Sequence, residues 1–156
     1  MTFCESSPTL LFSGGTGLGK TFLSACIART VADNGYSVVY ESAAHLFSKL
    51  EQAKFNPTEE SRREAAKFLE CDLLIIDEFG YLPIDEEGSR LLFQIISDSY
   101  ERRSIIYTSN IEFSGWGRVL GDANMAAALI DRTVHHGRII RFQGGSYRSE
   151  HALMTK

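Results

Sequence analysis

The sequence has few cysteines, and their spacing excludes two common uses. Cys4, Cys26 and Cys71 are odd in number and far apart, and the chain contains no CxxC pair. A disulfide framework is typically built from an even number of cysteines, and a structural zinc site from closely spaced pairs. The thiols are therefore typical of a reduced, cytosolic protein, and the predicted localisation is cytoplasmic.

Long apolar runs are also missing. No stretch approaches the roughly 18 consecutive apolar residues that a membrane-spanning helix needs. The N-terminal segment MTFCESSPTLLF has no basic region ahead of its short apolar stretch, so no secretion signal is predicted. With 156 residues, 44% of them apolar and 23% charged, the composition is typical of one soluble globular domain without a membrane partner.

The third shortage is one of positive charge. The net charge of -4 argues against a strongly basic nucleic-acid-binding protein. The charges are unevenly distributed, since residues 1–100 carry 8 Lys and Arg against 15 Asp and Glu, whereas residues 101–156 carry 8 against 5. Contact with DNA would therefore need a local patch, or an oligomer that adds several patches. On charge alone, the favoured interpretation is that the last third of the chain simply has a solvated basic face.

Short apolar runs alternate with helical periodicity along the whole chain. Strands are predicted at residues 9–12, 37–40, 73–76, 105–107 and 139–142. Helices are predicted at residues 20–33, 43–54, 59–70, 87–102 and 125–135. Alternation of this kind predicts an α/β fold with right-handed crossovers, in which a five-stranded parallel sheet lies between helices in a three-layer arrangement.

A glycine-rich loop joins the first predicted strand to the first predicted helix. It fits the pattern G-x-x-x-x-G-K-[ST] in full and consists of Gly14, Gly15, Thr16, Gly17, Leu18, Gly19, Lys20 and Thr21. Glycines let successive backbone N–H groups converge on phosphate oxygens, and the helix N-terminus adds partial positive charge. We expect Lys20 to reach the β- and γ-phosphates and the Thr21 hydroxyl to ligate Mg²⁺.

Two carboxylates follow the buried strand at residues 73–76. Asp77 lies at the strand end beside the phosphate loop, where it can hold Mg²⁺ through water. Glu78 is placed to orient and polarise an attacking water. A P-loop kinase for a small molecule has no use for such a residue, whereas a nucleotide hydrolase does. The pair favours hydrolysis, with the kinase and a nucleotide-gated adaptor that barely turns over as the alternatives.

Two further polar side chains are candidates for the same chemistry. Asn110 ends the strand SIIYTSN, and the carboxyl ends of parallel strands meet at one edge of a sheet. We therefore expect it within reach of the γ-phosphate or the attacking water. Arg132 lies about 200° around its helix from Ile130, which the pattern Ala126, Ile130, Val134 assigns to the buried face. It should point away from its own core, either into solvent, as most outward arginines do, or into a neighbouring subunit's site, where it would stabilise transition-state charge.

Other side chains invite functional readings that their context does not favour. Trp116 in FSGWG is predicted to pack between strand and helix and not to stack on a base. His135 and His136 are adjacent on a helix and point about 100° apart, which is poor geometry for holding a metal. Capping of the last helical carbonyls is the favoured role for this pair.

The four nucleotide elements, in this order, resemble those of the AAA+ ATPases. More closely, the chain resembles the branch that contains IstB-type transposition helpers and DnaC/DnaI-type helicase loaders, and the match covers nearly its whole length. IstB-like stretches are DLLIIDEFGYLPIDEEGSRLLFQIIS, TSNIEFSGWGRVLGDANMAAALIDRTVHHGRI and GGSYR. The stretches LLFSGGTGLGKTFLSACIA and VVYESAAHLFSKL are closer to DnaC and DnaI. The longer IstB-like portion favours the transposition helpers.

The resemblance implies one AAA+ ATP-binding domain over residues 1–156, without the C-terminal helical lid of many AAA+ proteins. The implied site residues are Lys20 and Thr21 in the first nucleotide motif, Asp77 and Glu78 in the second, Asn110 at the sensor position and Arg132 as an arginine finger acting in trans. The resemblance also implies ATP and Mg²⁺ as cofactors, and homo-oligomers that assemble on DNA and serve a transposase or a replicative helicase.

The chain departs from the family pattern at its N-terminus. Family members usually carry an N-terminal region that engages the partner, whereas here the first predicted strand begins within ten residues of Met1. The sequence leaves open whether such a region is missing. It also leaves open whether Arg148 in GGSYR replaces the arginine that other AAA+ proteins carry in the lid, or touches DNA.

Overall fold

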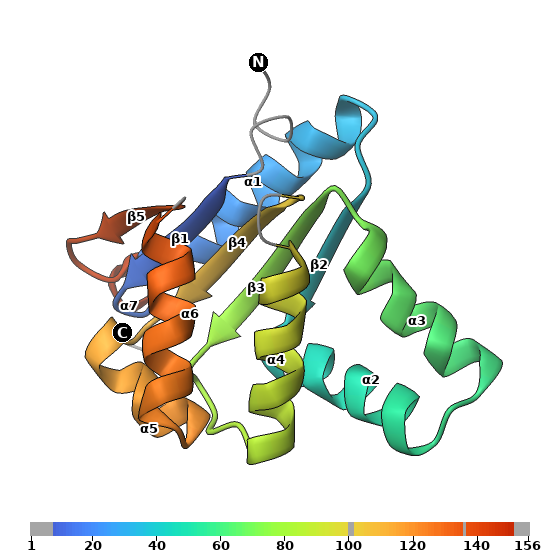
Figure 1. The fold of residues 1–156 in the computed structure, drawn as a ribbon. Coiled ribbons are helices and arrows are strands. Elements are labelled where there is room, and N and C mark those ends of the chain that lie inside the picture. The colour runs from blue at the N-terminus through green and yellow to red at the C-terminus, as the bar shows by residue number, and fades with distance from the viewer. Residues whose placement is uncertain (1–7, 100–101, 136, 152–156) are drawn as a thin grey trace.

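In the part of the chain that the structure describes, five parallel strands form a single sheet in the order β2-β3-β4-β1-β5 (Figure 1). The computed structural model describes residues 8–99, 102–135 and 137–151. The strands are β1 (Thr9–Gly14), β2 (Val38–Ser42), β3 (Leu73–Phe79), β4 (Ser104–Ser109) and β5 (Gly137–Phe142). This arrangement confirms the predicted five-stranded parallel sheet, and all five strands end at the same edge.

Helices cover both faces of the sheet. They are α1 (Lys20–Asp33), α2 (Ala43–Phe55), α3 (Glu59–Glu70), α4 (Glu86–Ser99), α5 (Trp116–Leu120), α6 (Ala123–His135) and α7 (Tyr147–Glu150), with a 3₁₀ turn, η2 (Phe113–Gly115). In Figure 1, α4 and α6 stand in front of the sheet and α1 lies behind it. The periodicity predicted five of these helices, whereas η2, α5 and α7 are too short to show a repeat. None of the described helices is long and apolar enough to cross a membrane.

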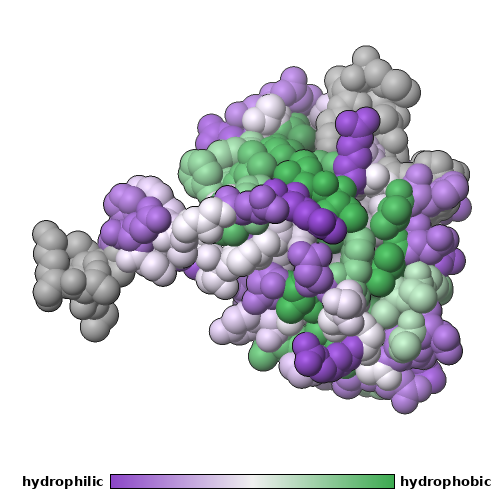
Figure 2. All heavy atoms as spheres, turned by 90° about the vertical axis from the view of Figure 1, so that its left-hand side faces the viewer, coloured by the Kyte–Doolittle hydropathy of each residue, from purple (hydrophilic) through white to green (hydrophobic). Residues whose placement is uncertain are grey.

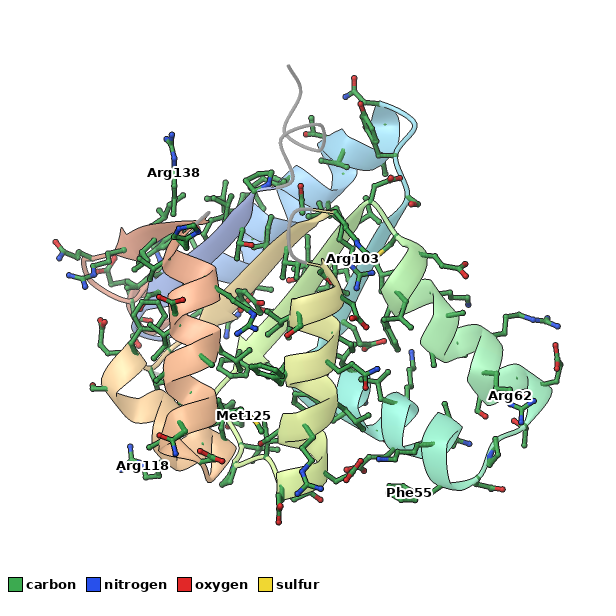
Figure 3. The ribbon with its side chains drawn as sticks, viewed as in Figure 1. Phe55, Arg62, Arg103, Arg118, Met125 and Arg138 are labelled. Atoms are coloured by element: carbon green, nitrogen blue, oxygen red, sulfur yellow. The ribbon has the colours of Figure 1, made fainter. Side chains whose placement is uncertain are left out.

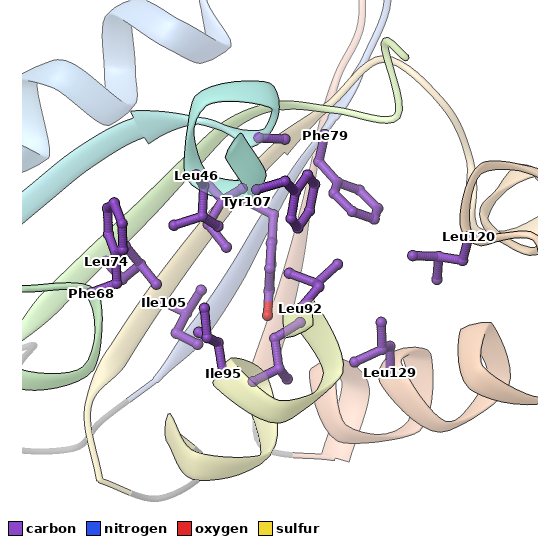
Figure 4. Close-up of a cluster of buried hydrophobic side chains, with 14 of the residues drawn as sticks. Leu46, Phe68, Leu74, Phe79, Leu92, Ile95, Ile105, Tyr107, Leu120 and Leu129 are labelled. Carbon is purple, nitrogen blue, oxygen red and sulfur yellow. The ribbon is translucent and has the colours of Figure 1, made fainter. Parts of the chain in front are cut away.

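The central strands are buried on both faces. Residues Leu73 to Ile76 of β3 have no exposed surface, as the continuous apolar run predicts for a central parallel strand. The larger of two apolar clusters lies on the side of α2, α4 and α6, and Figure 4 shows Leu92 of α4 and Leu129 of α6 packed near Tyr107. A smaller cluster around Phe12 lies under α1. Because apolar side chains pack against both faces of the sheet, the carboxyl ends of its central strands are held in fixed positions.

Trp116 belongs to the larger cluster. Its side chain has no exposed surface, and its ring meets those of Phe79 and Phe113 edge-on, with centroids 4.6 and 5.0 Å apart. A ring enclosed in this way cannot stack on a nucleic-acid base. The prediction that Trp116 packs inside the fold is confirmed.

The last strand, β5, forms one edge of the sheet and is exposed along most of its length. Ile139 and Ile140 on β5 and Val134 on α6 all keep a third or more of their surface accessible. Figure 2 views this side of the molecule, where apolar surface is interrupted by hydrophilic side chains. The well-packed part of the fold lies around β3 and β4.

The buried face of α6 differs from the predicted one. The structure buries Ala126, Leu129 and Thr133, and Val134 is 50% exposed. Both spacings, i, i+3, i+7 and i, i+4, i+8, fit one side of a helix, so the sequence alone did not separate them. Thr133 can be buried because its hydroxyl donates to the Leu129 carbonyl oxygen at 2.8 Å. This rotation changes the surroundings of Arg132.

Candidate functional site

The glycine-rich loop runs between the end of β1 and the start of α1. Gly14 and Gly17 adopt φ angles of 150° and 81°, which side-chain-bearing residues rarely take. Each is also crowded, because a Cβ at Gly14 would collide with the Phe142 carbonyl oxygen and a Cβ at Gly17 with the Ser146 hydroxyl. Glycine is therefore required at both positions by conformation and by close packing.

The N-terminus of α1 is built differently from those of α2 and α3. Side chains of Ser42 and Thr58 cap α2 and α3, whereas Gly19 precedes α1 and, among the described residues, no side chain caps it. The first backbone N–H groups of α1 thus remain available, together with the partial positive charge of the helix end. This arrangement is suited to an anion lying on the loop.

Lys20 places its ammonium group against the loop. Its Nζ donates to the carbonyl oxygens of Gly14 at 2.8 Å and Gly15 at 2.6 Å. Burial lowers the pKa of Lys20, the negative charge of Asp77 opposes that change, and the positive charge of Arg148 adds to it. The cation is therefore partly stripped of water, which strengthens its attraction for a phosphate group.

Asp77 lies at the end of β3 in a ring of hydroxyl groups. Its carboxylate, 7% exposed, accepts hydrogen bonds from Thr21 Oγ1 at 3.2 Å, from the Tyr40 hydroxyl at 2.8 Å and from Thr108 Oγ1. The two residues expected to share a metal ion, Thr21 and Asp77, are thus in direct contact. These three hydroxyl groups fix the orientation of the carboxylate beside the loop.

The sequence interpretation missed Tyr40 and Thr108. Burial raises the pKa of Tyr40 to about 12, a hydrogen bond with Ser24 acts in the opposite direction, and Asp77 adds to the rise. Tyr40 therefore remains a neutral donor to the carboxylate at physiological pH. The available signal was position, because both residues lie near the carboxyl ends of strands that flank β3.

Glu78 follows Asp77 at an irregularity in β3. Ile76 pairs with Tyr107 and Phe79 with Ser109, so β3 has one extra residue here relative to β4. Glu78 has a φ of 59°, and it is the one non-glycine residue with positive φ in the described part of the chain. Bulges re-aim side chains, and strained backbone gathers at functional sites. The Glu78 side chain is exposed and lines the cavity beside the loop.

One cavity of about 870 Å³ brings most of the predicted residues together. Loop residues 16–21 line it, with Glu78, Thr108 and Asn110 from the ends of β3 and β4. Residues of the C-terminal segment, among them Tyr147 and Arg148, form another part of its wall. Its size is in the range of small-molecule sites. The expectation that Asn110 lies level with the loop and with the end of β3 agrees with this placement.

Arg132 is not among the described residues that line this cavity. Its guanidinium carbon sits 4.7 Å from the centre of the Phe93 ring of α4, and Nη1 donates to the Ala128 carbonyl oxygen at 3.3 Å. The side chain is half-buried, which corrects the expectation that it points away from its own core. The reason is the rotated buried face of α6, which turns Arg132 toward α4.

A family model described as IstB-like ATP binding protein matches residues 1–155. The chain belongs to this family. Two curated relatives of this IstB-like chain are the insertion sequence IS232 putative ATP-binding protein of Bacillus thuringiensis subsp. berliner, 39% identical over 148 residues, and the insertion sequence IS21 putative ATP-binding protein of Pseudomonas aeruginosa, 35% identical over 150. Each alignment covers 95% of this chain and 58% or 55% of the relative. The chain thus spans a little more than half the length of these relatives.

Solved structures share the fold of this IstB-like chain. The DnaC helicase loader superposes with a TM-score of 0.74 at 18% identity, covering 91% of this chain and 82% of that one. DnaI gives 0.72 at 20% identity, covering 92% and 77%. AMPPCP-bound DnaA from Aquifex aeolicus gives 0.70 at 23%, covering 91% and 43%. The IstB-like chain has the α/β P-loop NTPase fold of AAA+ domains, as predicted.

The residues of the IstB-like site fit a nucleoside triphosphate with Mg²⁺. The loop offers backbone N–H groups and Lys20, and the cavity beside it has room for a nucleotide. Among the described residues, no group of three His, Cys, Asp or Glu side chains is arranged to hold a metal. The pair Thr21 and Asp77 suits Mg²⁺, which takes one or two protein ligands and completes its shell with phosphate and water. His136, the second residue of the predicted His135–His136 capping pair, lies outside the described residues.

Proposed function

We propose that this chain is the AAA+ domain of an insertion-sequence helper protein. It binds ATP with Mg²⁺, hydrolyses it when assembled as a homo-oligomer on DNA, and assists a transposase. The observation that carries the proposal is the meeting of three elements at one sheet edge. Lys20, Thr21 and Glu78 line one cavity, and Asp77 is in contact with Thr21.

Each residue has a role that follows from its placement. Lys20 and the backbone N–H groups of the loop hold the outer phosphates, and Thr21 and Asp77 hold Mg²⁺. The bound triphosphate supplies a phosphoryl group that water can attack. Glu78, which lies on the bulge and lines the cavity, orients that water. Asn110, on the same wall, positions the water or the γ-phosphate.

The family membership supports the choice of partner. The curated relatives are described as putative ATP-binding proteins of insertion sequences, and the resemblance to IstB-type transposition helpers makes a transposase the proposed partner. A structural neighbour is the replication initiator DnaA bound to AMPPCP and single-stranded DNA, with a TM-score of 0.70 at 21% identity. That likeness concerns the fold, and it makes DNA a reasonable surface for assembly. The excess of Lys and Arg over Asp and Glu in residues 101–156 also favours contact with DNA.

A second function rests on a separate observation. The likeness to the DnaC helicase loader covers 82% of that structure, so a helicase-loading role is the alternative. The 39% identity to the IS232 protein, against 18% to DnaC, favours the transposition role. Binding of the purified chain to the transposase or the replicative helicase of the same cell separates the two.

Release of free phosphate tests the proposed reaction. We expect purified protein with ATP and Mg²⁺ to release phosphate without any acceptor, and the rate to rise when DNA and higher protein concentration favour assembly. Transfer to a nucleoside or metabolite, with no free phosphate, would support the P-loop kinase alternative instead. Tight ATP binding with no release under any assembly condition would point to the nucleotide-gated adaptor.

A further inference from the structure

The side chain of Tyr40 connects the edge strand β2 with the end of β3. Its hydroxyl donates to Oδ2 of Asp77 at 2.8 Å. In the register of the two strands, Tyr40 pairs with Ile75, whereas Asp77 pairs with Ser42. The hydroxyl therefore reaches two residues further along β3 than the backbone of Tyr40 does, roughly 7 Å at the rise of a strand. A tyrosine is long enough for this contact, and a serine or threonine at the same position is not.

A buried serine on α1 meets the same hydroxyl. Ser24 has no exposed surface, and its Oγ donates to the Thr21 carbonyl oxygen at 2.9 Å and lies 3.1 Å from the Tyr40 hydroxyl. A tyrosine hydroxyl has one proton to give, and Tyr40 gives it to Asp77. Ser24 is therefore the donor where the two hydroxyls meet. The chain of hydrogen bonds runs from α1 through β2 to the carboxylate on β3.

The two oxygens of Asp77 have different partners. Oδ1 accepts from Thr21 Oγ1 at 3.2 Å, from the Glu78 backbone N–H at 3.1 Å and from Thr108 Oγ1. The hydrogen bond from Tyr40 goes to the other oxygen, Oδ2. A donor on Oδ2 resists rotation of the carboxyl group, so Oδ1 stays beside the Thr21 hydroxyl.

Tyr40 and Ser24 act from behind the site. Neither is among the described residues that line the nucleotide cavity, whereas Thr21 and Thr108 both line it. A substitution at Tyr40 or Ser24 therefore removes no group from the cavity wall. Residues that hydrogen-bond to a metal-binding carboxylate orient it, and their loss typically weakens metal binding while the ligands themselves remain.

We propose that Tyr40 is a positioning residue for the magnesium site, which holds Asp77 through Oδ2 in the orientation that Thr21 and Asp77 need to receive Mg²⁺. The inference rests on the proposed function, since it concerns the metal of that nucleotide site. Ser24 supports Tyr40 from α1 and ties the position of the carboxylate to the helix that carries Thr21. Lys20 and the loop hold the phosphates independently of this contact.

ATP binding with and without the metal tests this inference. Equilibrium dialysis with ATP, in Mg²⁺ and in EDTA, is carried out on the wild type, Tyr40→Phe, Ser24→Ala and the double variant. Tyr107→Phe is the matched control, because it also removes one tyrosine hydroxyl. That hydroxyl is buried in the larger apolar cluster (Figure 4) and has no hydrogen-bond partner among the described residues. Circular dichroism establishes that each variant is folded.

We expect Tyr40→Phe to reduce the gain in ATP affinity that Mg²⁺ provides by about 10-fold, the lower end of what such supporting hydrogen bonds contribute. The ATP affinity in EDTA should stay within about twofold of the wild type. Ser24→Ala should reduce the gain less, and the double variant should lose little more than Tyr40→Phe, because Ser24 acts through Tyr40. Tyr107→Phe should keep the full gain.

Each of the contrary outcomes has a separate meaning. A full Mg²⁺ gain in Tyr40→Phe, with ATP binding lost in Lys20→Ala, would reject the role of Tyr40 and leave the proposed function intact. Equal weakening of ATP binding in Mg²⁺ and in EDTA would make Tyr40 a structural support of the loop and overturn the inference. A folded wild-type chain that binds no ATP would remove the proposed function and this inference with it.

Discussion

Replacing Arg132 with alanine is expected to lower ATP turnover in the assembled state by about 10³- to 10⁵-fold, the range measured for arginine fingers. The expectation follows from the position of Arg132 on α6, away from the cavity of its own chain in the described structure. A finger stabilises the charge that develops on the transferred phosphoryl group. The measurement is phosphate release over a range of protein concentrations, with and without DNA.

A mixing experiment shows whether Arg132 acts between subunits. Arg132→Ala keeps an intact phosphate loop, and Lys20→Ala keeps an intact arginine, so the two inactive variants should restore activity when combined. Arg118→Ala is the matched control, because Arg118 is an exposed arginine on α5 (Figure 3). Unchanged turnover in Arg132→Ala at every protein concentration would reject the role in trans. Failure of the mixture to recover would place the action of Arg132 within its own chain.

The second large effect is expected at Glu78. Glu78→Gln should lower turnover by about 10²- to 10⁴-fold, the usual contribution of a general base, while leaving ATP affinity near the wild-type value. Glutamine keeps the shape of the side chain on the bulge and removes the charge that attracts the proton of water. Single-turnover phosphate release and a separate binding titration measure the two quantities.

Glu86→Gln provides the control for Glu78. Glu86 is an exposed acid in the first turn of α4, where it pairs with Arg90. It is not one of the described residues that line the cavity. Its turnover should stay within about twofold of the wild type, as for ordinary surface substitutions. A Glu78→Gln variant that hydrolyses ATP as fast as the wild type would show that water is activated elsewhere. The nucleotide-gated adaptor alternative predicts very slow phosphate release in both the wild type and Glu78→Gln.

The parts of the site that the sequence predicted are those that local chemistry determines. The loop from Gly14 to Thr21 carries its own signal, since glycines, lysine and threonine at fixed spacing lie between a strand and a helix. Asp77, Glu78 and Asn110 follow apolar runs, and parallel strands bring their carboxyl ends to one edge. Chain spacing and sheet geometry were enough to predict that these residues gather.

The parts that the sequence did not predict depend on tertiary packing. Tyr40 meets Asp77 because of the pairing register of β2 with β3, which no single strand specifies. The bulge on which Glu78 lies is a mismatch in register between β3 and β4. Arg148 lies beside the loop because the segment after β5 folds back onto Gly17, a contact between residues far apart in the sequence. The rotation of α6 that turns Arg132 toward Phe93 depends on what packs beneath it.

Titration calorimetry of the folded chain with ATP, in the presence and absence of Mg²⁺, tests the central claim most directly. The account predicts saturable ATP binding that Mg²⁺ strengthens and that Lys20→Ala abolishes, because Lys20, Thr21 and Asp77 meet at one sheet edge. Circular dichroism and thermal unfolding establish that both proteins are folded. Folded wild-type protein that takes up no ATP in the presence of Mg²⁺ would contradict the account.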